Sequence, residues 1–378
     1  MDIIYVTGVI YPKKSQSGAK KKIISQTQCL SKLGVNIKCF YPKYILNYRI
    51  SQIIYKITEP YHLLLLRKKY SENTIIYIRR GPGHLNCIPS IILSLNHKNH
   101  YHVVLEIQDL ERKVPIYWPQ NIPRTIISIY DRISLTLFGN LLINSVDAIV
   151  SVTDEITAQN TNRTKGYLPY LTLGNGINIK SYDIRMSKYL CKESEIHVLI
   201  VALVEQWHGI DRFIRGLHEY ESTPDKRDII LHIVGDGAEL PHLKELTAEL
   251  NLQDRVIFHG FKSGKELDEM FDMCHIALDA LAGFRKGLTE TSSLKSREYC
   301  ARGIPFIASS KDADFPDGWE YVQKIPDDET PIDMNTVVDF ANRVMADPEH
   351  PQKMRRYAEE HLDWLAKMKV LKEFLESL

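Results

Sequence analysis

The sequence predicts an α/β protein with two Rossmann-like domains, each built on a doubly wound parallel sheet. Short β-rich runs alternate with longer amphipathic runs, which is typical of parallel α/β architecture. The alternation restarts near residue 196, and 378 residues are long for one core. The halves also differ in charge: residues 1–190 hold 25 Lys and Arg against 11 Asp and Glu (+14), and residues 191–378 hold 23 against 36 (−13).

In the first half, the β-rich runs predict strands at residues 2–8, 36–42, 74–80, 102–108, 148–153 and 170–174. Helical stretches separate most of them. The loop at residues 6–24 (VTGVIYPKKSQSGAKKKII) follows the first strand, and Gly18 and Lys20 lie where it enters the first helix. We expect an acceptor phosphate near these lysines; a solvated loop is the alternative.

The second half predicts strands at residues 196–203, 229–237, 255–260, 275–281 and 305–310. The polar stretch 181–195 lacks a strand pattern and predicts the linker. We therefore expect an N-terminal domain at 1–185, a C-terminal domain at 186–360, and a helix at 361–378 that packs back on the N-terminal domain. In such a pair of open sheets, ligands bind at the carboxyl ends of the strands, in the strand-to-helix loops.

Composition narrows the class of protein. Hydrophobic content of 44% and charged content of 25% are ordinary for a soluble enzyme. No run approaches the roughly 18–20 apolar residues of a spanning helix, and six scattered cysteines show no zinc spacing, so we expect a cytoplasmic protein with reduced thiols. Hydrolase, zincin and P-loop motifs are absent. The cluster His97, His100 and His102 lacks an acidic partner, so no metal site is expected.

The stretch GLTETSSLKSREYCARGIPFIAS (287–309) predicts a binding loop followed by a helix. Ser292 or Ser293 is a natural N-cap, and Gly303 with Pro305 ends the helix near Arg302. Glu290 then lies in the loop and Glu298 in the early turns. A helix N-terminus attracts phosphate, and Arg285 and Lys286 add positive charge. Two solvated acids that favour the helix dipole are the alternative interpretation.

Two further loops of the second half are candidates. The run LHIVGDG (231–237) is a weak dinucleotide signal but predicts a tight strand-to-helix turn at Gly235. The run VALVEQWHGIDRF (201–213) places His208 and Gly209 between a strand and a helix, where His208 is either a diphosphate contact or a structural residue.

The order VGDG, HG, E-x7-E and G-x-P resembles retaining glycosyltransferases of the two-domain GT-B fold, family-4 type. The stretches GNGIN (174–178) and YAEEHLDWLAKM (357–368) extend the resemblance over nearly the whole chain. It implies that Glu290 lies beside the donor sugar and that Glu298 holds the ribose hydroxyls. It also implies that the backbone near Ser293 and Leu294 binds the diphosphate, and that Gly260 and Phe261 lie by the nucleobase.

The chain departs from the family at two places. The usual Arg/Lys pair after the first strand of the second domain is replaced, with His208 in the lysine position, and Arg285, Lys286 or Lys295 are candidates for its role. The first-domain histidine after the fourth strand is not evident, and Glu106, Gln108 and Asp109 stand there instead. Glu106 is the candidate on the acceptor side.

The resemblance implies a metal-independent hexosyltransferase that uses a UDP- or GDP-sugar as co-substrate, without a tightly bound cofactor, and serves cell-surface polysaccharide synthesis. The expected acceptor is a saccharide or a lipid-phosphate-linked saccharide; no nucleic acid is expected. The basic first domain predicts peripheral contact with the inner face of the membrane, and YHLLLLRKKY (61–70) is the candidate segment. A nucleotide-sugar epimerase of GT-B fold and a non-catalytic partner subunit are the alternatives.

Overall fold

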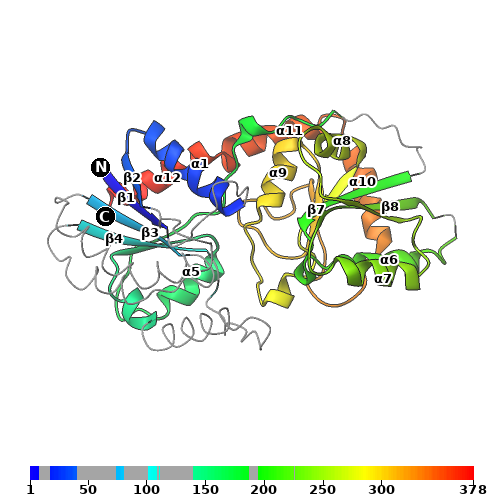
Figure 1. Ribbon diagram of the computed structural model, residues 1–378, viewed down its shortest axis with the longest axis horizontal. Coiled ribbons are helices and arrows are strands. Elements are labelled where there is room, and N and C mark those ends of the chain that lie inside the picture. Colours follow the sequence, from blue (N-terminus) through cyan, green and yellow to red (C-terminus); the bar gives the residue numbers. More distant parts are fainter. Residues whose placement is uncertain are drawn as a thin grey trace, which may run out of the picture. The chain divides into compact units, whose positions relative to one another are not determined.

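A computed structural model shows two compact units, Met1–Gly174 with Trp364–Leu378, and Asn175–Asp363 (Figure 1). It describes residues 1–7, 18–40, 74–80, 101–108, 110, 139–186, 195–224 and 226–378. The boundary at Gly174/Asn175 falls within the GNGIN step, earlier in the chain than the stretch 181–195 where the linker was expected. The candidate membrane segment 61–70 lies outside the described residues.

Unit 1 is the first of these two bodies, and its described strands form one parallel sheet in the order β2-β1-β3-β4-β5-β6. Its elements are β1 (Asp2–Thr7), α1 (Gly18–Lys32), β2 (Asn36–Phe40), β3 (Thr74–Arg80), β4 (Tyr101–Ile107), β5 (Ala148–Ser151), α5 (Asp154–Thr161), β6 (Tyr170–Thr172) and α12 (Trp364–Glu376).

The apolar runs of unit 1 are buried on both faces, as parallel strands require. Ile23 of α1 and Trp364 and Met368 of α12 pack on the face that carries Tyr5 and Tyr77. Ile156 of α5 packs on the opposite face with Ile76 and Val103. The C-terminal helix α12 therefore belongs to the core of unit 1, although its sequence neighbours belong to unit 2.

Unit 2 also holds one parallel sheet in its described residues, in the order β12-β11-β10-β7-β8-β9. Its elements are η1 (Ile179–Ser181), β7 (Glu195–Leu203), η2 (Gln206–His208), α6 (Ile210–Tyr220), β8 (Asp228–Asp236), α7 (Leu240–Glu249), β9 (Val256–Gly260), α8 (Lys265–Met273), β10 (Ile276–Leu278), η3 (Gly283–Lys286), α9 (Leu294–Arg302), β11 (Phe306–Ala308), β12 (Val322–Lys324), α10 (Met334–Met345), α11 (His350–Tyr357) and η4 (Ala358–Leu362), a π-helix.

The strand order of unit 2 reverses between β10 and β7. Successive strands from β7 to β9 run to one side, and β10 to β12 run to the other. In Figure 1, α6 and α7 lie on one side of this sheet and α8 and α9 on the other. Ligands of open α/β sheets bind at such a switch point, outside the carboxyl ends of the strands. The loops that follow β7 and β10 are therefore the first place to look for a site.

The predicted fold class is confirmed, because two parallel sheets with interspersed helices are present. Within the described residues, every strand expected from the sequence occurs, with ends that differ by a few positions. The sequence missed β12 (Val322–Lys324), which is short and carries polar side chains. None of the described helices is both long and apolar enough to cross a membrane.

A row of histidines crosses the sheet of unit 2. The ring nitrogens of His197 and His232 lie 2.8 Å apart, and those of His232 and His259 lie 2.9 Å apart. Glu195 lies 3.3 Å from the other nitrogen of His197. Burial, followed by the neighbouring imidazoles, lowers the pKa of His232 to about 3, and burial lowers that of His275 to about 4. The rings of His232 and His275 are therefore neutral in the folded protein at neutral pH.

The buried histidines predict a loss of stability in acid. A histidine of the unfolded chain has a pKa of about 6.5, so between about pH 6.5 and 4 the unfolded chain binds more protons than the folded one. The free energy of unfolding should fall over this window, on the order of 2 kcal/mol per buried imidazole at about pH 5. Urea unfolding at about pH 8 and 5 measures the loss. His232→Gln should reduce it, whereas the half-exposed control His361→Gln should not; an equal loss in all three proteins would contradict the assignment.

Candidate functional site

The loop before α9 fixes Glu290 at the carboxyl edge of unit 2. Thr291 N–H donates to Lys311 O at 2.7 Å, and Lys311 N–H donates to Thr289 O at 3.0 Å, which forms a short parallel bridge. The Glu290 side chain is 15% exposed, and Lys311 Nζ lies 3.8 Å from its Oε1. The backbone therefore holds this carboxylate in place while part of it faces solvent.

Helix α9 begins after Ser293, which is the N-cap. The Ser293 backbone is extended (φ −71°, ψ 133°), and its Oγ accepts from Lys295 N–H at 3.2 Å. The same hydroxyl donates to Asp279 Oδ1 at 2.8 Å, and Asp279, just after β10, is buried. The helix ends at Gly303 in the left-handed region (φ 77°), as the Gly-x-Pro step predicts. The first turn of α9 thus points its N–H groups at the carboxyl edge of the sheet.

Asn175 of the GNGIN step braces this loop from a distant part of the sequence. Its N–H donates to Ser292 Oγ at 2.6 Å, and its Nδ2 donates to Ser292 O at 2.5 Å. Arg297 Nε donates to Asn175 O at 2.9 Å. The two motifs that resemble the family therefore contact each other within unit 2, which sequence reasoning did not predict.

Arg297 holds α9 in place through buried ion pairs. Its side chain is 0% exposed, and its guanidinium forms ion pairs with Asp312 and Asp314. It also donates to Ser293 O at 3.2 Å, next to the N-cap. No local sequence pattern links these residues, because Asp312 and Asp314 follow β11 whereas Arg297 lies in α9. They hold the start of α9 against the loop that follows β11.

Positive charge gathers around His208 at the switch point. Lys295 Nζ, from the first turn of α9, lies 3.3 Å from Asp279 Oδ1, and Lys286 Nζ lies 3.6 Å above the centre of the Trp207 ring. Burial, followed by the charges of Lys295 and Lys286, lowers the pKa of His208 to about 2. Burial also lowers the pKa of Lys295. His208 is therefore neutral, and the two lysines supply the charge.

The loops after β7 and β10 are joined by backbone contacts. Leu281 N–H donates to His208 O at 3.1 Å, and Ala282 N–H donates to Trp207 O at 3.3 Å. Gly209 between them adopts φ 63°, and a Cβ there would lie 2.9 Å from the Leu281 carbonyl carbon. Only glycine fits this close approach, so Gly209 sets the distance between the two loops.

Arg285 lies in the same segment, but its guanidinium contacts carboxylates of this chain. It forms two hydrogen bonds of 2.8 Å with Asp211 and an ion pair with Glu329, and it donates to Gln206 O at 2.9 Å. The hydrogen bonds that its guanidinium donates to these carboxylates raise the pKa of Arg285. Of the three cations considered from sequence, Lys286 and Lys295 lie near His208, whereas Arg285 ties η3 to α6.

Glu298 lies in the second turn of α9, 22% exposed. Arg302 Nε donates to its Oε1 at 2.9 Å, and the same guanidinium donates to Asp268 Oδ1 at 2.8 Å. Phe271 lies under that guanidinium, 4.3 Å from its ring centre. Arg302 thus orients one oxygen of Glu298 and leaves the carboxylate near the surface.

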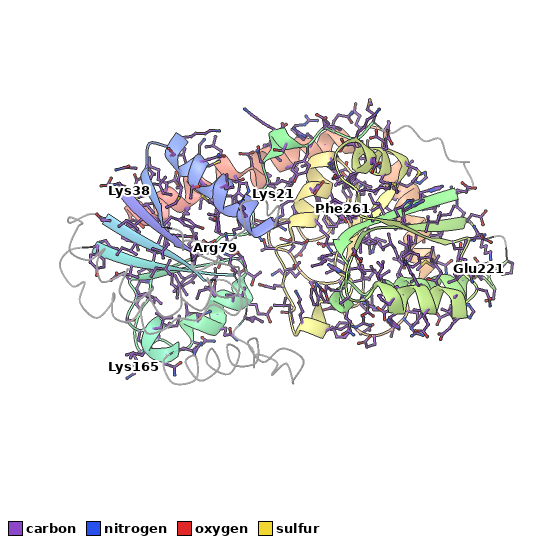
Figure 2. The ribbon with its side chains drawn as sticks, in the orientation of Figure 1. Lys21, Lys38, Arg79, Lys165, Glu221 and Phe261 are labelled. Atoms are coloured by element: carbon purple, nitrogen blue, oxygen red, sulfur yellow. The ribbon has the colours of Figure 1, made fainter. Side chains whose placement is uncertain are left out.

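The loops after β8 and β9 lie on the other side of the switch point. Gly235 adopts φ 130°, and a Cβ there would lie 1.9 Å from Ala202 O, so the tight turn requires glycine. Gly260 is the last residue of β9 and has φ 65°. The next residue in the chain, Phe261, is 78% exposed (Figure 2). An aromatic ring so exposed at the carboxyl edge is available for stacking.

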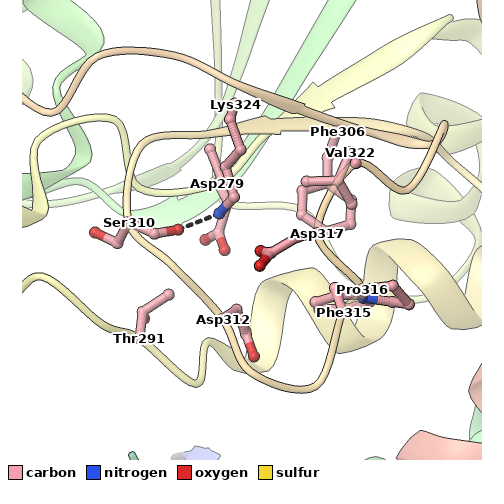
Figure 3. Close-up of a pocket in the computed structure, with 12 residues that line it drawn as sticks. Asp279, Thr291, Phe306, Ser310, Asp312, Phe315, Pro316, Asp317, Val322 and Lys324 are labelled. Atoms are coloured by element: carbon pink, nitrogen blue, oxygen red, sulfur yellow. Dashed lines mark hydrogen bonds between the residues drawn. The ribbon is translucent and has the colours of Figure 1, made fainter. Parts of the chain in front are cut away.

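Thr291 is one of the residues that line a small cavity of about 30 Å³ (Figure 3). Asp279, Ser310, Asp312 and Lys324 are among its polar lining residues, and Lys324 Nζ donates to Ser310 O. Its volume suits one or two water molecules rather than a sugar ring. A donor sugar would therefore have to lie outside it.

Glu106, the candidate acceptor-side residue, is buried in unit 1 near the carboxyl end of β4. Its oxygens accept from Tyr5 at 3.1 Å, Gln26 at 3.3 Å and Gln108 at 2.6 Å, and Lys22 Nζ lies 3.3 Å away. Burial alone would raise the pKa of Glu106, but Lys22 and further charges and hydrogen bonds lower it. It is an ionised carboxylate held by side chains of its own unit.

The other two acceptor-side candidates lie in α1. Gly18 is its first residue, and Lys20, in its first turn, is half-buried. The loop that precedes α1, residues 8–17, lies outside the described residues. Within the described parts of the chain, no group of three or more His, Cys, Asp and Glu side chains is arranged to hold a metal ion.

Comparison with known proteins identifies the fold. The family Glycosyl transferases group 1 matches residues 183–361. No curated protein sequence matches the chain. Among solved structures, sucrose-phosphate synthase from Thermosynechococcus elongatus is similar with a TM-score of 0.66 at 15% identity, covering 100% of this chain and 99% of that one.

Two further solved structures are similar over the same span. The lipopolysaccharide outer core galactosyltransferase WaaB has a TM-score of 0.64 at 14% identity and covers 100% of this chain and 99% of its own. Anabaena HepE in complex with UDP and glucose has a TM-score of 0.60 at 14% identity, with the same coverage. At these identities the structures establish the fold, which is GT-B. Residues 183–361, which match the family model Glycosyl transferases group 1, contain every loop at the switch point of unit 2.

Proposed function

We propose that the chain is a retaining, metal-independent glycosyltransferase of the family-4 type, which transfers a hexose from a nucleoside diphosphate sugar to a saccharide acceptor. One observation supports this most directly. The region that matches the group 1 family brings two loops, a helix N-terminus and two lysines to one switch point, an arrangement that would suit a diphosphate.

The donor's leaving group would bind at the first turn of α9. N–H groups at a helix N-terminus and the ammonium groups of Lys286 and Lys295 stabilise negative charge that develops on a diphosphate. Asp279 holds Lys295 by an ion pair, and Ser293 caps the helix above it. Because these donors are already in place, no metal ion is needed to neutralise the leaving group.

The two glutamates would hold the two ends of the donor. Glu290, fixed by the bridge to Lys311, would contact the sugar. Glu298, oriented by Arg302, would accept from the ribose hydroxyls. Phe261 would lie against the nucleobase. The UDP-bound HepE structure, similar in fold, makes a UDP-sugar the first donor to test.

The reaction would proceed with retention on one face of the sugar. The bond from the anomeric carbon to the diphosphate oxygen breaks, and the acceptor oxygen forms the new bond on the same face. The acceptor's proton passes to a phosphate oxygen of the leaving group. No side chain of this chain then needs to act as a nucleophile.

The acceptor would bind to unit 1, which is strongly basic: residues 1–100 hold 16 Lys and Arg against 3 Asp and Glu. Such a surface attracts an anionic acceptor, for instance a lipid-phosphate-linked saccharide at the inner face of the membrane. Gly18, Lys20 and the charged cluster around Glu106 lie at or near the carboxyl ends of its strands. The product would serve cell-surface polysaccharide synthesis.

A transfer assay tests the proposal. The protein is incubated with UDP-glucose or UDP-galactose, a set of saccharide acceptors and EDTA, and NMR follows the anomeric proton of the product. We expect UDP release that requires an acceptor, with the donor's anomeric configuration in the product. Conversion of the nucleotide sugar without any acceptor would indicate an epimerase instead, and an inverted product would rule out retention.

Glu298→Gln should weaken nucleotide binding while the protein stays folded. The amide keeps one acceptor oxygen but loses the charge, so UDP affinity should fall about tenfold, as expected for a hydrogen bond to a charged group. Isothermal titration with UDP measures it. Glu269→Gln, on α8 and exposed, is the matched control and should bind as the parent protein does; equal affinity in both variants would refute the role of Glu298.

A further inference from the structure

His208 is a buried residue of the turn between β7 and α6, with 7% of its surface exposed. Its backbone is fixed at both ends: its N–H donates to Glu205 O at 3.0 Å, and its O accepts from Leu281 N–H. Trp207 lies beside it, with ring centres 5.9 Å apart. The ring therefore has a set position at the switch point of unit 2.

One nitrogen of the ring is already used. Glu205 N–H donates to Nδ1 of His208 at 3.2 Å, so Nδ1 is an acceptor and carries no hydrogen. A neutral imidazole has one N–H, which must then be on Nε2. The hydrogen bond from Glu205 thus fixes the tautomer.

The other nitrogen is available. Within the described residues, Nε2 of His208 has no hydrogen-bond partner. The atom is also not fully buried. It therefore reaches solvent, at the carboxyl end of β7. The ring presents a single N–H donor outward beside the first turn of α9.

The charges that face the ring come from two other elements. Lys286 of η3 and Lys295 of α9 both act on His208, and its own turn contributes the backbone of Glu205. Two ammonium groups so close disfavour a third positive charge. The imidazole thus cannot serve as a substitute for a lysine's charge.

We propose that His208 binds a phosphate oxygen of the sugar donor through Nε2–H, as a hydrogen-bond donor, while Lys286 and Lys295 carry the positive charge. The inference rests on the proposed function and specifies how the site works without the family's usual Arg/Lys pair. Nδ1, on the buried side of the ring, accepts the hydrogen bond from the turn, and Nε2, on the exposed side, donates to the ligand.

Two substitutions test the roles of Nε2 and Nδ1 separately. In His208→Gln, the amide nitrogen lies near the position of Nε2, so the outward donor is kept. In His208→Asn, the shorter amide oxygen lies near the position of Nδ1, so the bond from Glu205 is kept and the outward donor is lost. We expect the Gln variant to bind UDP within about threefold of the parent protein and the Asn variant to bind about tenfold more weakly. Uridine should bind both variants equally.

The reverse order, with Asn retaining affinity and Gln losing it, would show that His208 only stabilises the turn. Equal UDP affinities in the two folded variants would also overturn the proposal. If neither variant folds, ¹⁵N NMR of the parent protein decides. We expect Nε2 to be protonated and Nδ1 not, from about pH 5 to 8, with an Nε2 shift on adding UDP. Titration of the ring within this range, or no shift with bound UDP, would contradict the inference. A parent protein that binds no nucleoside diphosphate would instead refute the proposed function.

Discussion

Replacing Glu290 with glutamine is expected to abolish sugar transfer while leaving nucleotide affinity almost unchanged. Glu290 lies in the loop before α9, where the bridge to Lys311 fixes its backbone. It would contact the sugar, whose anomeric carbon gains positive charge as the diphosphate leaves, and a nearby carboxylate stabilises that charge. The turnover rate should fall at least about 100-fold, and the Kd for UDP should change less than about threefold.

The rate is measured as acceptor-dependent UDP release, and the Kd by titration. Glu290 is partly exposed and its ion pair with Lys311 is long, at 3.8 Å, so the change should cost little stability. Glu298→Gln is the informative counterpart, because it should alter binding rather than turnover. A Glu290→Gln enzyme with full turnover, or one that loses UDP binding, would show that the residue has another role.

Replacing Arg297 with methionine is expected to cause the largest loss of stability. The guanidinium is completely buried between Asp312 and Asp314 and also donates to Asn175 O. Methionine fills part of the space but leaves two carboxylates without their cation. Breaking a buried pair in this way costs about 3–5 kcal/mol.

Urea unfolding of unit 2, followed by circular dichroism, gives the change in the free energy of unfolding. Arg343→Met is the matched control, because Arg343 lies exposed on α10 and its change should be within about 0.5 kcal/mol. Because Arg297 also holds the start of α9, UDP should bind more weakly to its variant. A loss no larger than that of the control would mean that the ion pairs do not stabilise the fold.

Much of the fold is predictable from local sequence. Runs such as DIIYVTG and IHVLIVAL are long and apolar enough to specify buried parallel strands. Ser293 and Gly303 mark the ends of α9 by their own chemistry, as a hydroxyl acceptor and a residue that tolerates φ 77°. By contrast, β12 has only three residues, and pairing with β11 rather than composition makes it a strand.

The site is less predictable, because its geometry depends on residues far apart in the chain. Asn175 contacts Ser292, and Arg285 binds Asp211 and Glu329; no local pattern links these positions. The sequence therefore identified three candidate cations but not which of them lie near His208. Asp279, which contacts both Ser293 and Lys295, directly follows a short apolar strand and gave no sequence signal.

The measurement that tests the central claim most directly is the melting temperature of the parent protein with UDP, GDP and ADP, each with and without EDTA. A ligand that binds only the folded protein stabilises it, by about 2.7 kcal/mol at 100 times its Kd. We predict that one of the three, with UDP the first candidate, raises the melting temperature equally in EDTA. No rise with any of them, at concentrations up to several millimolar, would contradict the account of unit 2 as a donor-binding domain.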